Sequence, residues 1–105
     1  MKTSNFLVAV LNEVCTVCEY IMINGKNSDF KNVNESLKEL LEDVTNNFHK
    51  SISARLGELE CLTDDYMLEV MSDGLTDSWT VQVVLIAVDL YKKCKKEKLQ
   101  LVKNL

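Results

Sequence analysis

Residues 6–23 read FLVAVLNEVCTVCEYIMI, and this stretch decides the fold class. Its apolar residues recur three and four positions apart, so at 3.6 residues per turn they share one broad helical face, while Glu13 and Glu19 lie opposite. Gly25 follows and can end such a helix in a left-handed conformation. The pattern predicts a helix over residues 5–24 with one side in a core.

A second apolar stripe predicts a helix over residues 34–61, which follows a polar connection over residues 25–33 and which Asn34 can cap. The stripe consists of Leu37, Leu40, Leu41, Val44, Phe48, Ile52, Leu56 and Leu59. Arg55 falls within this stripe, so its guanidinium must reach solvent at the edge or pair with a carboxylate.

The second half of the chain is expected to add two more helices. Thr63 can cap a short helix over residues 64–72, and a long apolar helix is predicted over residues 77–102. One continuous helix through Gly74 is the alternative. With no proline and three glycines in 105 residues, the chain favours long helices. We expect one all-α domain over residues 1–105, a compact bundle of four to five helices.

The composition narrows the classes of function. Hydrophobic residues make up 47% of the chain and charged residues 27%, which is typical of a globular domain. The net charge of −4 argues against general nucleic-acid affinity. Six lysines nevertheless crowd the C-terminus, at positions 92, 93, 95, 96, 98 and 103. They form either a solvated helix end or a basic patch for an acidic partner.

The N-terminal region does not have the pattern of an export signal or a membrane span. Asn12 and Glu13 interrupt the apolar run, and Glu19 follows within the same stretch. We therefore expect a cytoplasmic protein whose four cysteines are reduced thiols.

Cysteine and histidine are the first residue types that could carry chemistry. Cys15 and Cys18 form a C-x-x-C motif that could bind zinc together with Cys61 and Cys94, or could form a redox pair. Its place on the apolar face of a helix favours core thiols. His49 is the only histidine, and its place on the polar side of the second helix favours a surface residue over a general base. We expect no metal and no cofactor.

Paired carboxylates are the strongest sign of an enzyme. Glu39 and Glu42 stand three apart, and Asp73 and Asp77 stand four apart farther along the chain. Two helices that each offer a pair of carboxylates can hold Mg²⁺ between them, and a magnesium–triphosphate complex can be hydrolysed there.

At residues 36–90 the chain resembles the MazG-like all-α nucleotide pyrophosphohydrolases. Glu39-Leu-Leu-Glu42 is similar to the first metal-binding element of that family, and the stretch from Asp73 to Asp77, which runs into an apolar helix, is similar to the second. The resemblance implies a magnesium-dependent nucleoside triphosphate pyrophosphohydrolase with these four carboxylates as ligands. This enzymatic function is the alternative hypothesis, and a protein without catalysis is the leading one. The reason is that Glu39 and Glu42 lie opposite the leucine stripe and so would point toward water and not into the bundle.

The last helix gives the leading hypothesis. Between residues 81 and 91 only Gln82 and Asp89 are strongly polar, so the sequence leaves just one narrow stripe for water. The predicted contact residues are Val81, Val84, Leu85, Val88 and Tyr91. We expect a small acidic protein-interaction module, such as an inhibitor, an immunity or anti-defence factor or an adaptor, whose partner is another protein and first of all a second copy in a homodimer. A central helix wrapped by the others is the alternative.

Overall fold

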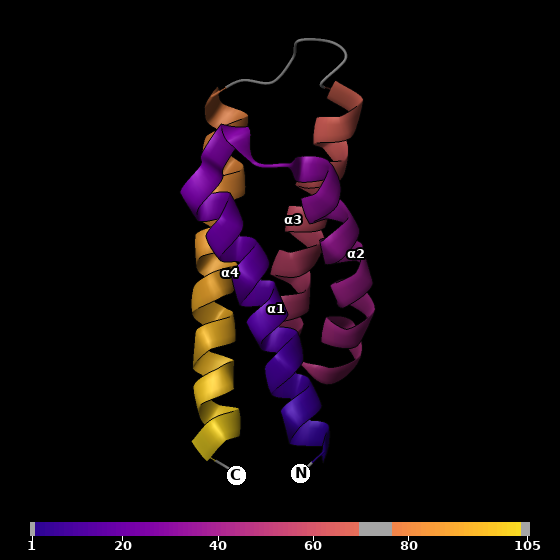
Figure 1. Ribbon diagram of the computed structural model, residues 1–105, viewed down its shortest axis with the longest axis vertical. Helices are drawn as coiled ribbons and strands as arrows, with labels where there is room; N and C mark the ends of the chain where they lie inside the picture. Colours follow the sequence, from indigo (N-terminus) through magenta and orange to yellow (C-terminus); the bar gives the residue numbers. More distant parts are fainter. Residues whose placement is uncertain (1, 70–76, 104–105) are drawn as a thin grey trace.

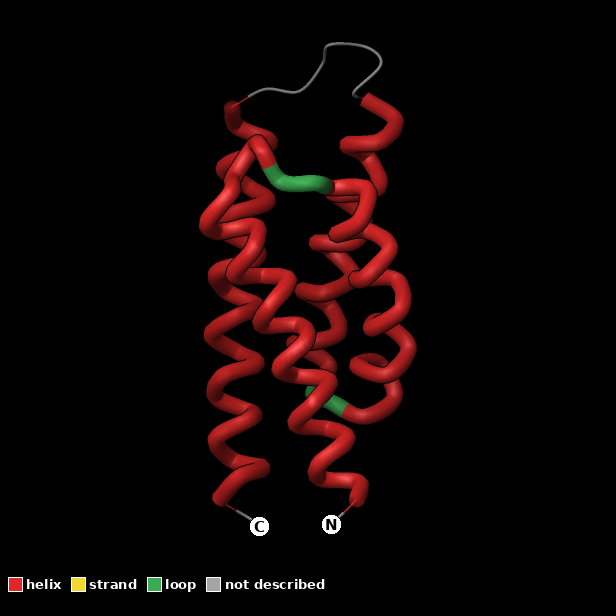
Figure 2. The backbone as a smooth tube through the Cα atoms, in the orientation of Figure 1, coloured by secondary structure: helices red, strands yellow, loops and turns green. Residues whose placement is uncertain are grey.

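The computed structural model describes residues 2–69 and 77–103, and in these residues four α-helices run up, down, up and down without a strand (Figures 1 and 2). The helices are α1 (Lys2–Asn24), α2 (Phe30–Asn47), α3 (Lys50–Glu69) and α4 (Asp77–Lys103). α1 packs against α2 and α4, and α3 packs against the same two helices. The all-α bundle expected from the sequence is confirmed, and it is elongated, with extents of 48 × 20 × 20 Å.

The connection between α1 and α2 begins as the sequence predicts. Gly25 takes a φ of 53°, and it opens a single 3-10 turn, η1, over Gly25–Asn27. The next helix, however, starts before Asn34. The carboxylate of Asp29 accepts the backbone N–H of Asn32 at 3.3 Å, so Asp29 caps α2 and the polar connection is shorter than expected.

The helix expected over residues 34–61 is in fact two helices. Phe48 takes an extended conformation, with φ −127° and ψ 174°, and the carbonyl of His49 accepts the first N–H groups of α3. The apolar stripe continues across this turn because α2 and α3 are antiparallel neighbours that face one core. The 3.6-residue spacing of apolar residues therefore continues where the chain reverses, and neither proline nor glycine marks the turn. For this reason the sequence pattern predicted one helix.

Asn34 and Thr63 do not cap helices. Both are buried within helices, and the side-chain amide of Asn34 donates to the Thr63 hydroxyl at 2.8 Å and to the Glu60 carbonyl at 3.1 Å. The hydroxyl of Thr63 in turn donates to the Glu60 carbonyl at 2.9 Å. The separate helix expected from residue 64 is therefore wrong as far as residue 69, because α3 passes through Thr63 without a break. Residues 70–76, with Gly74, lie outside the described residues.

Each helix contributes one face to a single core. From α1 and α2 the core takes Val10, Leu11, Val14, Cys15, Cys18, Ile21, Phe30, Val33, Leu37, Leu40 and Val44. From α3 and α4 it takes Ile52, Leu56, Leu59, Val83, Ala87, Leu90 and Cys94. At one end, the rings of Phe30, Tyr66 and Trp79 pack together with centroids 4.9 to 5.4 Å apart. Burial of these faces is what holds the helices side by side.

α1 is also the most apolar helix of the described chain. By length and composition alone, the segment Asn5–Asn27 could cross a membrane, and about a third of its apolar stretch is buried inside the bundle. A core helix meets the same criterion, and the buried face of α1 packs against α2 and α4.

Candidate functional site

α4 buries one face completely. Val83, Ala87, Leu90 and Cys94 are spaced four, three and four apart, and none of them has measurable exposure. They face the interior between α1 and α3, the two helices that α4 contacts. The opposite face of α4 points away from the bundle.

That outward face is apolar where a surface helix is normally polar. Val81 is 55% exposed and Leu85 is 61% exposed. Val84, Val88 and Tyr91 are half-buried on the same side, between the core and the solvent. The five predicted contact residues therefore divide into two exposed side chains and three at the margin.

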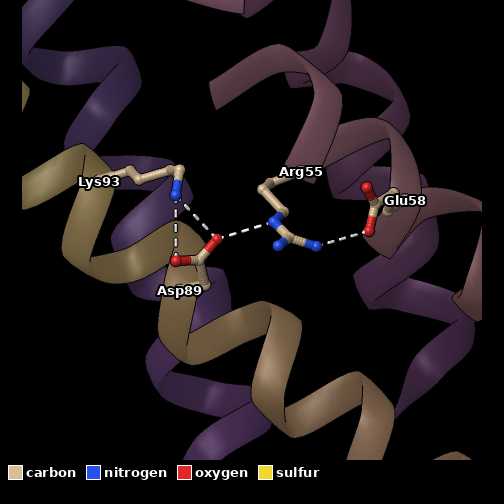
Figure 3. A network of polar contacts seen from close by, with 4 residues as sticks. All are labelled: Arg55, Glu58, Asp89 and Lys93. Carbon is tan, nitrogen blue, oxygen red and sulfur yellow. Dashed lines mark hydrogen bonds and ion pairs between the residues drawn. The ribbon is translucent and has the colours of Figure 1, made fainter. Parts of the chain in front are cut away.

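The polar stripe of α4 lies elsewhere than expected. Gln82 is exposed, but Asp89 is turned toward α3, where its carboxylate accepts the Nε–H of Arg55 at 2.7 Å (Figure 3). Lys93 donates to both oxygens of Asp89 at 3.0 Å, and Arg55 also bonds Glu58 at 2.8 Å. Of the two outcomes expected for Arg55, the structure shows both: its guanidinium pairs with carboxylates, and its side chain is 41% exposed at the edge of the bundle. The polar stripe thus joins two helices, and the apolar residues are left to the solvent.

These contacts shift the pKa values of the charged groups. The hydrogen bond from Lys93, supported by the charges of Lys93 and Arg55, lowers the pKa of Asp89 below its ordinary value. The hydrogen bond to Glu58 and the nearby carboxylates raise the pKa of Arg55. Asp89 therefore stays ionised at neutral pH, and its carboxylate is paired with Arg55 and Lys93 at the partly exposed edge of α3 and α4.

The apolar line on α4 is longer than the sequence suggested. Leu99 is 62% exposed and Val102 is 49% exposed, and both follow the earlier residues at helical spacing. We call this line the outer seam, and it consists of Val81, Leu85, Val88, Lys92, Lys95, Leu99 and Val102. Because lysines interrupt the apolar residues, the sequence analysis did not identify the whole seam. Its regular steps of four and three residues could have identified it.

The seam changes character along its length. Lys92 and Lys95 interrupt it, and both are exposed, as is Lys96 beside them. The ammonium of Lys95 lies 5.3 Å from the centroid of the Tyr91 ring, a cation–π contact. One half of the seam is therefore aliphatic, and the other half combines aliphatic side chains with positive charge.

Of the four carboxylates of the alternative function, the structure describes the side chains of two, Glu39 and Glu42. Glu39 and Glu42 lie on α2 and are exposed. Asp73 lies outside the described residues, and Asp77 is the first residue of α4, but its side chain is not described. Among the described side chains no group of three or more histidines, cysteines, aspartates or glutamates could hold a metal ion. The magnesium site thus stays a hypothesis from the sequence.

The cysteines divide by burial. Cys15, Cys18 and Cys94 are buried between α1 and α4, whereas Cys61 is exposed on α3, and none of the four is in a disulfide. A hydrogen bond with Cys94 and the nearby Lys95 and Lys98 lower the pKa of Cys15 to about 7. The same hydrogen bond and burial raise the pKa of Cys94, and burial raises the pKa of Cys18 to about 12.

His49 comes directly before α3 and lies outside the helices. The sequence pattern had instead placed it within the helix expected over residues 34–61. It is exposed, and its carbonyl accepts the N–H groups of Ile52 and Ser53 at 3.0 and 3.2 Å. Its position explains the turn between α2 and α3.

Comparison with protein-family models, with curated proteins and with solved structures found no match for this chain. The outer seam is the most distinctive feature of the described surface.

Proposed function

We propose that this chain is a small, non-catalytic, cytoplasmic protein-interaction module that binds another protein through the outer seam of α4. The observation that supports this function is the exposure of Val81 and Leu85, at 55% and 61%, on a helix whose opposite face is already in the core. Full burial of a valine or leucine side chain contributes about 1.5–3 kcal/mol. A partner that covers both side chains would recover much of that free energy.

The arrangement of the exposed residues matters more than their number. Single apolar side chains are common on the surfaces of monomeric proteins and need no explanation. Here the exposed apolar residues of α4 lie on the outer seam, whose steps of four and three are completed by the half-buried Val88 and by Lys92 and Lys95. Such a line fits a helical partner, and the sequence-based expectation of a second copy is one form of it.

The experiment compares two matched substitutions. Leu85→Glu places a charge in the seam, while Ile23→Glu places the same charge at an 81% exposed position on α1. Sedimentation equilibrium of purified protein and capture of partners on immobilised protein should show an interaction that Leu85→Glu removes and Ile23→Glu keeps. If both variants behave like the wild type in both assays, the proposed function is wrong.

The enzymatic alternative has its own test. Incubation with nucleoside triphosphates and Mg²⁺ should release no pyrophosphate, because Glu39 and Glu42 are exposed to water on α2. Magnesium-dependent release that is lost in Glu42→Gln would replace the interaction module with a pyrophosphohydrolase.

A further inference from the structure

The outer seam has the geometry of the contact line on one helix of a coiled coil. Its seven positions alternate in steps of four and three residues, which is the spacing of contact residues between paired helices. From Val81 to Val102 the seam covers 21 residue steps, or about 32 Å at 1.5 Å per residue. A partner helix of about 22 residues could lie along its whole length.

The charges on the seam restrict the partner. Residues 92–103 contain six lysines and one glutamate. Lys93 is held by Asp89, but no described carboxylate forms an ion pair with Lys92, Lys95 or Lys96. An approaching partner would therefore meet uncompensated positive charge along one half of the seam.

A second copy of α4 fits this pattern poorly in either direction. In a parallel pair, Lys92 and Lys95 would lie against the same two lysines of the other copy, and like charges repel. In an antiparallel pair, one register places Lys95 opposite Leu85 and Lys92 opposite Val88, and the register seven residues along places Lys92 opposite Lys95. Neither arrangement supplies a carboxylate, because in residues 78–91 the only one is Asp89, which already binds Arg55 and Lys93.

We infer that the outer seam binds one amphipathic α-helix of a different protein, with aliphatic side chains against residues 81–88 and carboxylates against Lys92, Lys95 and Lys96. This inference rests on the proposed function and names the chemistry of its partner. Carboxylates at these positions give the complementarity that selects a partner and fixes its direction. Lysines within the contact line also argue against a lipid surface, because a helix that lies on a bilayer keeps its lysines on the opposite, polar face.

The probe is a synthetic helical peptide of about 25 residues, with leucines at the contact positions of one half and glutamates at those of the other. A second peptide has glutamine in place of each of these glutamates. Fluorescence anisotropy should show that the glutamate peptide binds the wild-type chain about tenfold more tightly than the glutamine peptide. The double variant Lys92→Glu and Lys95→Glu should lose this preference, whereas Lys26→Glu with Lys31→Glu, at exposed positions on other elements, should keep it.

The outcomes separate the two proposals. Equal affinity for both peptides, or no binding at about 100 µM, would overturn the acidic partner. If the wild type then sediments as a dimer that Leu85→Glu dissociates, the seam is still an interaction surface and its occupant is a second copy. Co-sedimentation with phosphatidylserine vesicles that depends on Leu85 would instead make the occupant a membrane. Circular dichroism of every variant shows that a lost interaction is not a lost fold.

Discussion

Asn34 shows how a single residue can be misassigned from sequence and still be important in the fold. A polar residue before a leucine stripe is typical of a helix cap, yet this side chain is 1% exposed and lies between α2 and α3. Its amide donates to the Thr63 hydroxyl and the Glu60 carbonyl, so the two helices share a buried polar contact. Because an unpaired polar group in the interior is costly, this contact favours one register of α2 against α3.

Substitution of Asn34 should therefore destabilise the bundle. We expect Asn34→Ala to lower the free energy of unfolding by about 1–3 kcal/mol, because the buried amide is replaced by a small void. The loss is limited because Thr63 keeps its own hydrogen bond to Glu60. Urea denaturation followed by circular dichroism measures this change. Asn46→Ala, at an exposed position on the same helix, is the control and should leave the midpoint nearly unchanged. Equal effects of the two substitutions would show that the buried contact contributes nothing.

At the scale of the helices, α4 is oriented by its polar residues as well as by its apolar ones. Asp89 lies between Arg55 of α3 and Lys93 of the next turn of α4, as Figure 3 shows. This arrangement is compatible with the buried face of α4 and holds Asp89 toward α3, while Val81 and Leu85 point outward. Each ion pair is partly exposed and contributes little free energy on its own, but together the pairs distinguish one rotation of α4 from the others.

The ion pairs predict a pH-dependent effect of Asp89. Its pKa in the folded chain is lowered from the ordinary 3.8, first by the hydrogen bond from Lys93, so its contribution to stability is present above 3.8 and is lost as the pH falls through the folded value. At about pH 7 we expect Asp89→Asn to reduce the free energy of unfolding by less than about 1 kcal/mol. Below the folded pKa the variant and the wild type should unfold at the same urea concentration.

Asp65→Asn is the control for this comparison, because Asp65 is exposed on α3. It should show no such pH dependence. A difference between Asp89→Asn and the wild type that persists in acid would mean that the ion pairs are not its cause.

At the scale of the whole molecule, α1 and α4 form the longest helix pair and hold the chain ends together. Figure 1 shows both termini at the same end, with α1 and α4 reaching past the turn between α2 and α3. Cys15, Cys18 and Cys94 lie buried between these two helices, so their accessibility reports on opening of the bundle. The low pKa of Cys15 favours its reactive thiolate, but its 5% exposure limits contact with a reagent.

Burial should decide which thiols react. In the native protein at about pH 8 we expect a chromogenic disulfide reagent to modify Cys61 quickly and the three buried cysteines only as the bundle opens. Unfolded, unreduced protein should give four reactive thiols. The rate at Cys61 should keep rising with pH above 9.0, because desolvation and the carboxylate of Glu60 raise the pKa of its thiol above that ordinary value. Cys61→Ser should abolish the fast phase; a fast phase that survives this substitution would place Cys15 within reach of solvent.

The sequence by itself determined the helical class, the boundary of α1 at Gly25 and the broad apolar face of the last helix, because these depend on periodicity and backbone preference within one segment. It did not determine the turn at Phe48 and His49, since a stripe with a 3.6-residue period looks the same when the chain reverses between two helices that share a core. The tertiary structure alone decided that Asn34 is buried and that Asp89 faces Arg55, because both outcomes depend on a partner that lies 26 to 34 residues away. Packing of the buried face of α4 against α1 and α3 sets the rotation of this helix, and with it which apolar residues enter the core and which form the outer seam.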